Sequence, residues 1–211
     1  WLPGLFGRNR TVQNDSAVEE RSRIYEVTGW INYFIDRERL LLDAITLLNF
    51  SERDDFSIGI VQGCMGVGLI LDHIKMFWFA ERYHRRGVIL AEQIKNPIAA
   101  GLSYLGRAIH EDILGKWEEA IEDCRKAAEA FWTAGNLRGW GAANSLCAEL
   151  FHFKGSFTQS FEIFKNISQV GQEGADNQIW GWGLWGLGLN QLCSGTFGEA
   201  EEFLHKSIEL H

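Results

Sequence analysis

A 40-residue internal repeat is the feature of this sequence that most limits how the chain can fold. Similar phrases begin at Gly115, Gly155 and Gly195, 40 residues apart. Each phrase has an aromatic residue two positions after the glycine and a small residue five positions after it: Trp117 and Ala120, Phe157 and Ser160, Phe197 and Ala200. One period earlier, Phe77 and Ala80 keep the pattern, while Lys75 replaces the glycine. A repeat of this length indicates a solenoid, a propeller or another array.

The spacing within each unit predicts two helices joined by a short turn at the glycine. The aromatic residue, the small residue and a later apolar residue (Cys124, Phe164 or Leu204) fall at i, i+3 and i+7, which lie on one face of a helix. Residues that favour the helix N-cap share another column, namely Asn96, Asn136 and Asp176. A third column contains the small residues Gly68, Ala108, Ala148 and Gly188. One helix pair cannot bury its apolar stripe, so neighbouring pairs must stack.

The predicted fold is therefore all-α, a right-handed α-solenoid of about five antiparallel helix pairs with a 40-residue period. Helices are expected at residues 16–34, 37–52, 56–73, 75–94, 97–114, 116–133, 137–153, 156–172, 177–193 and 196–210. Residues 1–14 are expected to form an irregular leader and residues 15–211 the repeat domain. Its repeats would cover residues 15–54, 55–94, 95–134, 135–174 and 175–211. Only an amphipathic pattern supports the first of these repeats.

Composition excludes several classes of function. The chain has 211 residues and a formal net charge of -8, which argues against a nucleic-acid-binding surface. Two weakly charged stretches, residues 56–71 and 177–198, fall in register with the repeat, so we expect no membrane span. The four cysteines show neither metal-type pairs nor the density of a disulfide framework. We interpret them as reduced packing residues and expect a cytoplasmic protein.

The repeated phrase resembles the tetratricopeptide repeat (TPR). The similarity is clearest at Leu187-Gly188 with Gly195, Phe197 and Ala200, and it covers residues 56–211 well and 16–55 loosely. The unit is longer than the usual TPR of about 34 residues. HEAT repeats have this longer unit and remain the structural alternative, although they lack a regular Gly-x-aromatic-x-x-Ala turn. The resemblance implies a module that binds a protein partner.

The long unit also resembles the C-terminal arrays of large bacterial signalling proteins. In those proteins a cyclase, kinase or DNA-binding module is joined to an AAA-like or NACHT-like ATPase and then to TPRs. Residues 1–8 and 48–53 are similar to the ATPase-to-TPR junction of cyclase-linked members. No cyclase or ATPase motif lies within the chain, so the resemblance supplies no catalytic residue. It implies a non-enzymatic scaffold for signal transduction, whose partner can be another domain of the same polypeptide.

The register predicts a concave groove formed by the first helix of each pair. Its expected residues are Tyr25, Asn32, Met65, Asp72, Leu105, Asp112, Ser145, Glu149, Trp182 and Trp185. An apolar floor with acidic groups suits a peptide or helix that carries basic residues. Two alternatives stay open. A neighbouring domain or helix can cover the groove, or the array can sense a small molecule in a pocket walled by Trp182 and Trp185.

Other motifs are expected to be structural. The sequence from Gly181 to Gly186 matches the dinucleotide fingerprint, but it lies inside a predicted helix and lacks the preceding strand. We interpret it as close helix packing in a helix that is soft unless it is tightly packed. His84, His152 and His205 lie in different repeat columns, and His110 has no second ligand at i+4. We therefore expect no histidine cluster, metal site or cofactor.

Overall fold

The computed structural model describes residues 20, 23–25, 27–29, 31–32 and 35–210, and the expected leader lies outside them. The described residues from 20 to 35 are helical. Nine further helices follow in the described part: α2 (Arg37–Arg53), α3 (Ser57–His73), α4 (Phe77–Ile94), α5 (Pro97–Ile113), α6 (Trp117–Thr133), α7 (Leu137–Phe153), α8 (Phe157–Glu173), α9 (Asn177–Ser194) and α10 (Phe197–Glu209). These nine agree with the predicted ranges to within two residues at each end, so the predicted helices are confirmed there.

The turns follow a shorter period than the sequence pattern indicated. Backbone φ is positive at one residue in every 20, at Asp55, Lys75, Lys95, Gly115, Gly135, Gly155, Ala175 and Gly195. Most of these turns close with a hydrogen bond back into the helix, as where Lys116 N donates to Glu111 O at 2.8 Å and Ser156 N to Phe151 O at 2.8 Å. This is the bond pattern of a Schellman turn. Each 40-residue unit is therefore two 20-residue segments of helix plus turn.

Turns with a positive φ at a residue other than glycine should be strained, and this strain can be tested. Ala175 has φ 51°, a left-handed conformation in which a Cβ atom costs about 1 kcal/mol or more. We expect Ala175→Gly to stabilise the chain by about 1 kcal/mol, and Gly155→Ala, at φ 78°, to destabilise it by a similar amount. Urea unfolding followed by circular dichroism measures both changes. Ala134 ends α6 at φ -79°, so Ala134→Gly is the control and should not stabilise. Equal effects at positions 134 and 175 would contradict this explanation.

The predicted N-cap column is confirmed. Asn96 Oδ1 accepts a hydrogen bond from Ala99 N at 3.1 Å, and Asn136 Oδ1 accepts one from Gly139 N at 2.9 Å. Asp176 caps α9 in the same way, and Pro97 occupies the first turn of α5. These side chains satisfy backbone N–H groups that have no partner within the helix. The helix starts are therefore determined locally, repeat by repeat.

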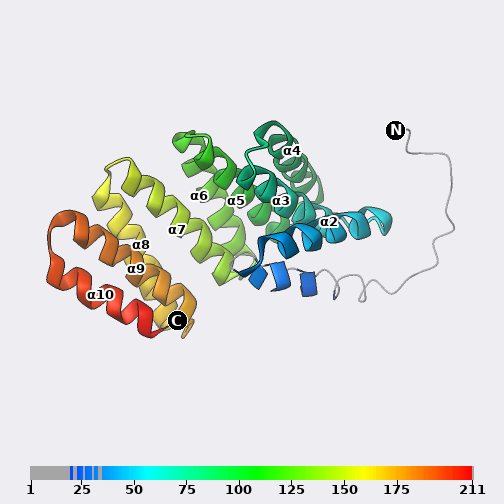
Figure 1. The fold of residues 1–211 in the computed structure, drawn as a ribbon. Helices are drawn as coiled ribbons and strands as arrows, with labels where there is room; N and C mark the ends of the chain where they lie inside the picture. The colour runs from blue at the N-terminus through cyan, green and yellow to red at the C-terminus, as the bar shows by residue number, and fades with distance from the viewer. Residues whose placement is uncertain (1–19, 21–22, 26, 30, 33–34, 211) are drawn as a thin grey trace.

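The helices form two layers of a solenoid (Figure 1). Each described helix from α2 to α10 packs against its neighbours in the chain. The first helices of successive pairs also contact one another, α3 with α5, α5 with α7 and α7 with α9. Within the described residues, the second helices α4, α6, α8 and α10 make no comparable contacts with one another. The closely spaced first helices therefore form the inner layer, which is where the sequence places the groove.

The glycine-rich helix α9 is tightly packed. A Cβ atom at Gly186 would lie 2.1 Å from Phe164 Cδ1, and one at Gly183 would lie 2.3 Å from Ser168 N. Both contacts are with α8, whose Phe164 is fully buried. The interpretation of residues 181–186 as a packing element is therefore confirmed.

As for a membrane, none of the helices in the described residues is both long enough and apolar enough to cross one.

Candidate partner-binding cavity

The inner layer encloses a cavity of about 480 Å³. Its lining comes mostly from three columns of the repeat: Gln62, Leu102, Ala142 and Trp182; Met65, Leu105, Ser145 and Trp185; and Leu69, Ile109 and Glu149. These columns are offset by three and four residues, so they lie on one face of each first helix. Residues of α2 and of the preceding segment, including Asp43 and Tyr25, close the other side. The periodic sequence thus produces one continuous inner surface.

Eight of the ten residues expected in the groove line this cavity. They are Tyr25, Met65, Leu105, Asp112, Ser145, Glu149, Trp182 and Trp185. Asn32 does not line it, but its amide Nδ2 donates to Asp43 Oδ2 at 2.7 Å, and Asp43 is a lining residue. Asn32 therefore contacts a residue of the cavity lining without lining the cavity itself.

Asp72 is the clear departure from the expected groove. It shares a column with Asp112, yet it is 2% exposed and does not line the cavity. His84 Nε2 lies 2.8 Å from Asp72 Oδ2, and His110 Nδ1 lies 2.6 Å from Asp72 Oδ1. The residues one repeat later than these histidines are Cys124 and Leu150, which cannot hold a carboxylate in the same way. Asp112 therefore stays at the cavity, whereas Asp72 is enclosed.

The expectation that the histidines form no cluster is wrong. Asp72 from α3, His84 from α4 and His110 from α5 meet in the interior. The sequence signal for this cluster is a spacing of 38 residues, which separates residues that meet between successive first helices. Asp72 contacts His110, 38 residues later, and His152 Nδ1 contacts Asn190 Oδ1 at 3.4 Å, again 38 residues later. The repeat columns have a spacing of 40 residues, so they do not predict neighbours that are 38 residues apart.

Two of the carboxyl groups in the lining, those of Glu149 and Asp112, have raised pKa values. Burial and, secondarily, the nearby Asp112 raise the pKa of Glu149 to about 7. Burial also raises the pKa of Asp112, partly offset by a hydrogen bond with Trp117. Ser145 Oγ is buried, and no described group lies within hydrogen-bond distance of it. The cavity therefore offers two carboxyl groups with raised pKa values within an apolar wall.

The two tryptophans form the far wall from α9. Trp185 is 42% exposed, and its ring meets Phe164 edge-on, with centroids 6.1 Å apart at 85°. Trp182 is partly buried and packs against the main hydrophobic core. An exposed aromatic face held by a buried partner is a preorganised contact surface. This arrangement suits an apolar group or a cation above the ring.

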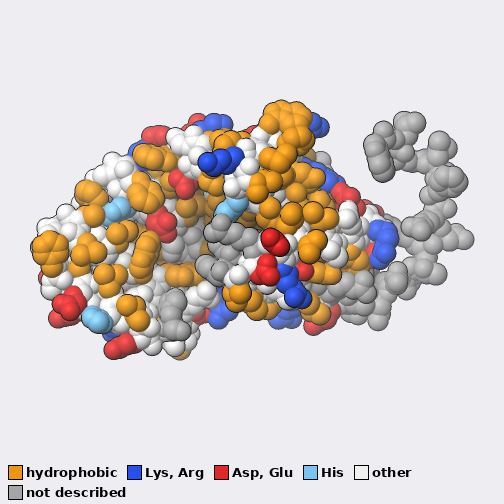
Figure 2. All heavy atoms as spheres, in the orientation of Figure 1, with side chains coloured by type: hydrophobic (Ala, Val, Ile, Leu, Met, Phe, Trp, Pro, Cys, Tyr) orange, Lys and Arg blue, Asp and Glu red, His pale blue; other side chains and the backbone are white. Residues whose placement is uncertain are grey.

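Apolar surface is also exposed outside the cavity. Large hydrophobic side chains project near the hairpin turns, including Trp78, Phe79, Phe153, Phe157 and Phe197. Figure 2 shows hydrophobic side chains gathered over the α3–α4 region and spread along the visible face toward α10. Exposed aromatic residues are therefore not confined to the cavity. A binding experiment must distinguish the two surfaces.

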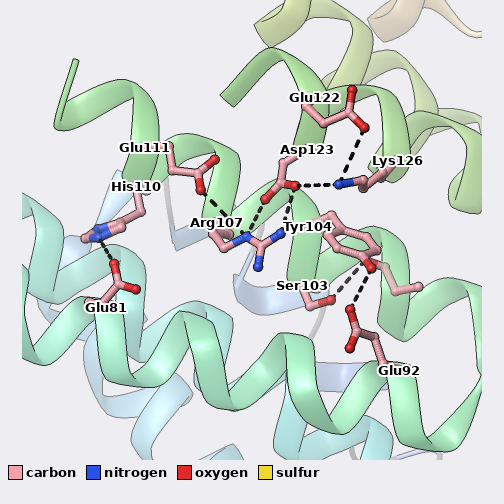
Figure 3. Close-up of polar contacts among 11 residues, drawn as sticks. Glu81, Glu92, Ser103, Tyr104, Arg107, His110, Glu111, Glu122, Asp123 and Lys126 are labelled. Carbon is pink, nitrogen blue, oxygen red and sulfur yellow. Dashed lines mark hydrogen bonds and ion pairs between the residues drawn. The ribbon is translucent and has the colours of Figure 1, made fainter. Parts of the chain in front are cut away.

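A polar network fixes α5 against α6 away from the cavity (Figure 3). Arg107 forms a two-pronged ion pair with Asp123, in which Nη2 donates to Oδ1 at 2.8 Å. Lys126 Nζ lies 3.6 Å from Asp123 Oδ1, and Arg107 also approaches the Tyr104 ring. Burial, and secondarily Asp123, raises the pKa of Glu111 to about 7. These contacts join neighbouring helices, and we assign them a structural role.

Three cysteines are buried in the core, as expected for packing residues. Burial raises the pKa of both Cys64 and Cys147 to about 11, and it raises that of Cys124 as well. A thiol with a raised pKa is a poor nucleophile near neutral pH, because the thiolate is the reactive form. The interpretation as a packing residue is wrong for Cys193, which is exposed near the C-terminal end of α9, with Sγ 3.6 Å from His152 Nε2.

Comparison with solved structures identifies the architecture. The chain is similar to the crystal structure of a putative kinesin light chain from Podosopora anserina with nearly identical TPR-like repeats. The TM-score is 0.60 at 10% identity, over 94% of this chain and 96% of that one. A point variant of that kinesin light chain gives a TM-score of 0.61 at 10% identity, with the same coverage of both chains. The chain folds as a TPR-like solenoid.

Other comparisons add little. BtubC (BKLC) from P. vanneervenii aligns over 83% of this chain and 91% of that one, with a TM-score of 0.49 and 13% identity. No protein-family model matches the chain, and no curated protein matches it in sequence. At these identities the structural likeness shows the fold alone. The predicted TPR-like fold is confirmed, whereas the relation to signalling ATPases stays a prediction.

Proposed function

We propose that this chain is a non-catalytic protein-interaction and regulatory scaffold that binds a segment of a partner protein in its inner cavity. The observation that carries the proposal is an apolar cavity with the carboxyl groups of Asp112 and Glu149 in its wall, both with a pKa raised by burial. A buried polar group without a partner costs free energy until a partner reaches it. The cavity is therefore complementary to a ligand with a basic group on an apolar body.

The partner segment should combine apolar anchors with Lys or Arg. A cationic side chain over Trp185 gains a cation–π interaction, and its charge offsets the carboxyl groups beside it. The net charge of -8 favours approach of a basic segment, while it disfavours nucleic acid. An amphipathic helix or an extended peptide fits this description. Binding would act on the rest of the protein through small changes in the stacking of the inner helices.

The proposal predicts a site-specific loss of binding. We expect a panel of fluorescent amphipathic peptides containing Leu and Arg to include binders, and Trp185→Ala to weaken such a binder at least about ten-fold. Fluorescence anisotropy measures the affinity, with circular dichroism as the check on folding. Trp78→Ala is the matched control, because Trp78 is 63% exposed but lies at a hairpin turn outside the cavity. An equal loss in both variants, or no binder that depends on Trp185, would contradict the proposal.

Small-molecule sensing is a second candidate, favoured by the size of the cavity. A volume of about 480 Å³ lies within the range of small-molecule sites, roughly 300–1,000 Å³. A thermal-shift screen with metabolites separates the two candidates. Stabilisation by a cationic metabolite that disappears in Trp185→Ala supports sensing, whereas capture of a peptide supports the scaffold.

We also infer that the array works within a larger cytoplasmic signalling protein with an AAA-like or NACHT-like ATPase, of bacterial type. The support is the resemblance of residues 1–8 and 48–53 to an ATPase-to-TPR junction, and the three buried cysteines suit a reducing compartment. In such a protein, the partner of the cavity can be another domain of the same chain. Sequencing the complete reading frame tests this inference, and an open reading frame without an ATPase module contradicts it.

A further inference from the structure

We propose that Asp72, His84 and His110 form a binding site for a divalent transition metal ion such as Zn²⁺. One ligand atom from each of these residues lies within 4.8 Å of the others. The side chains of Asp72, His84 and His110 are 0%, 1% and 1% exposed. They come from α3, α4 and α5, so an ion here would join two successive helix pairs. The site is separate from the cavity, and the inference does not depend on the proposed function.

The donor set is one that zinc uses. Zn²⁺ binds imidazole nitrogen and carboxylate oxygen at about 2.0–2.2 Å in tetrahedral geometry. Tetrahedral ligands at that length are about 3.3 Å apart. Asp72 Oδ2 to His84 Nε2 is 2.8 Å, and Asp72 Oδ1 to His110 Nδ1 is 2.6 Å. Each ring nitrogen therefore has to move about 0.5–0.7 Å away from the Asp72 oxygen that it contacts to admit the ion, and water can complete the coordination.

Glu81 supplies a further feature of a metal site. His110 Nε2, the ring nitrogen that faces away from Asp72, lies 3.0 Å from Glu81 Oε2 (Figure 3). A histidine that ligates a metal through one nitrogen usually donates its other N–H to a carboxylate or carbonyl, which fixes the tautomer. With His110 Nδ1 on the metal, Nε2 carries the proton and donates to Glu81. Glu81 is therefore a positioning residue for His110.

Charge balance favours the ion over protons alone. Without a metal, both nitrogens of His110 face carboxylate oxygens, and each such contact needs a proton on one of its two atoms. With a divalent ion, both imidazoles are neutral, and the carboxylates of Asp72 and Glu81 balance its two positive charges. A buried site is more stable when its charges are paired.

The surrounding backbone leaves room for the His84 ring. A Cβ atom at Gly68 would lie 2.6 Å from His84 Cε1, and one at Gly106 would lie 3.4 Å from His84 Nδ1. Glycine is less favourable than alanine within a helix, so each position carries a cost in helix stability. Both positions are close to the imidazole, so the two glycines of α3 and α5 open a slot that the ring occupies. The ligand is thus positioned from two sides.

The test titrates Co²⁺ into the full chain after chelator treatment, and repeats the titration with Co²⁺ present during refolding from urea. We expect one equivalent to bind, to give the visible absorption of tetrahedral cobalt, and to raise the melting temperature by about 5 °C or more at 100-fold excess over Kd. The pair Cys193 and His152 is a competing thiol site, with Sγ and Nε2 3.6 Å apart. A near-ultraviolet thiolate band would identify metal bound there and would overturn the assignment.

Variants locate the metal. We expect His84→Gln to abolish cobalt binding and Glu81→Gln to weaken it about 10- to 100-fold. Because Glu81 is 52% exposed, its variant should fold even where loss of His84 prevents folding. His205→Gln, at an exposed histidine of α10, is the matched control and should bind like the unchanged chain. Absence of binding under both loading conditions would show a proton-shared cluster only, and unchanged affinity in Glu81→Gln would also overturn the proposal.

Discussion

Gly183→Ala is expected to destabilise the chain by about 2 kcal/mol, although alanine is the better helix former. Propensity alone predicts a gain of about 1 kcal/mol. The added Cβ, however, would lie 2.3 Å from Ser168 N and 2.5 Å from Ser168 Cα, so it would meet the backbone of α8. Neither helix can yield without moving its neighbours, and overpacking of a core costs about 1–3 kcal/mol or more. Packing therefore outweighs propensity at this position.

Gly198→Ala is the matched control for that prediction. Gly198 lies in the first turn of α10, and a Cβ there has nothing within 4 Å. The same substitution should stabilise by about 0.5 kcal/mol. Urea unfolding of both variants, followed by circular dichroism, gives the free energies. A stabilising effect at both positions would mean that α9 tolerates separation from α8, and the packing explanation would then fail.

The helix boundaries could be predicted because each one depends on residues that lie next to it in sequence. Asn136 and Asp176 cap the helices that follow them, and Gly155 and Gly195 take the left-handed turn conformations. The 20-residue period was not predicted, because half of its turns use other residues. Lys95 and Ala175 adopt positive φ where glycine is the usual signal. At both positions the backbone N–H donates back into the preceding helix, from Lys95 to Ala91 O at 3.1 Å and from Ala175 to Gln172 O at 3.3 Å.

The lining of the cavity could also be predicted, because stacked repeats bring equal positions of each first helix to one surface. Met65, Leu105, Ser145 and Trp185 are such a column. The burial of Asp72 could not be predicted from its own column. It depends on His84 and His110, which lie in other columns and have no equivalents in the next repeat. The two histidines, which the next repeat lacks, therefore enclose Asp72, although the equivalent Asp112 lines the cavity.

Glu149→Gln is expected to stabilise the chain by about 3 kcal/mol above pH 8 and to have no such effect below pH 4.5. The cause is burial, which with Asp112 raises the pKa of Glu149 from its ordinary value of 4.5 to about 7. The folded chain therefore binds a proton that the unfolded chain releases between these values. The contribution of Glu149 to the free energy of unfolding is fully present below pH 4.5 and is lost as the pH rises through 7.

Thermal or urea unfolding from pH 4 to 9 measures this effect. The unchanged chain should lose stability across that window, and Glu149→Gln should lose less. Glu111 also has a raised pKa of about 7, so Glu111→Gln serves as a control that removes a separate part of the pH dependence outside the cavity. Identical pH profiles for Glu149→Gln and the unchanged chain would contradict the assignment of Glu149.

The same carboxyl group connects stability with binding. A basic group in the cavity would favour the ionised form of Glu149, so a peptide that binds there should release a proton near pH 6. Calorimetry in buffers of different ionisation enthalpy measures this release, which Glu149→Gln should abolish while it weakens binding. Glu149 would thus destabilise the array without a ligand, and its carboxylate would stabilise the complex by pairing with the basic group of the peptide. Proton release that persists in Glu149→Gln would assign the basic contact to Asp112 instead.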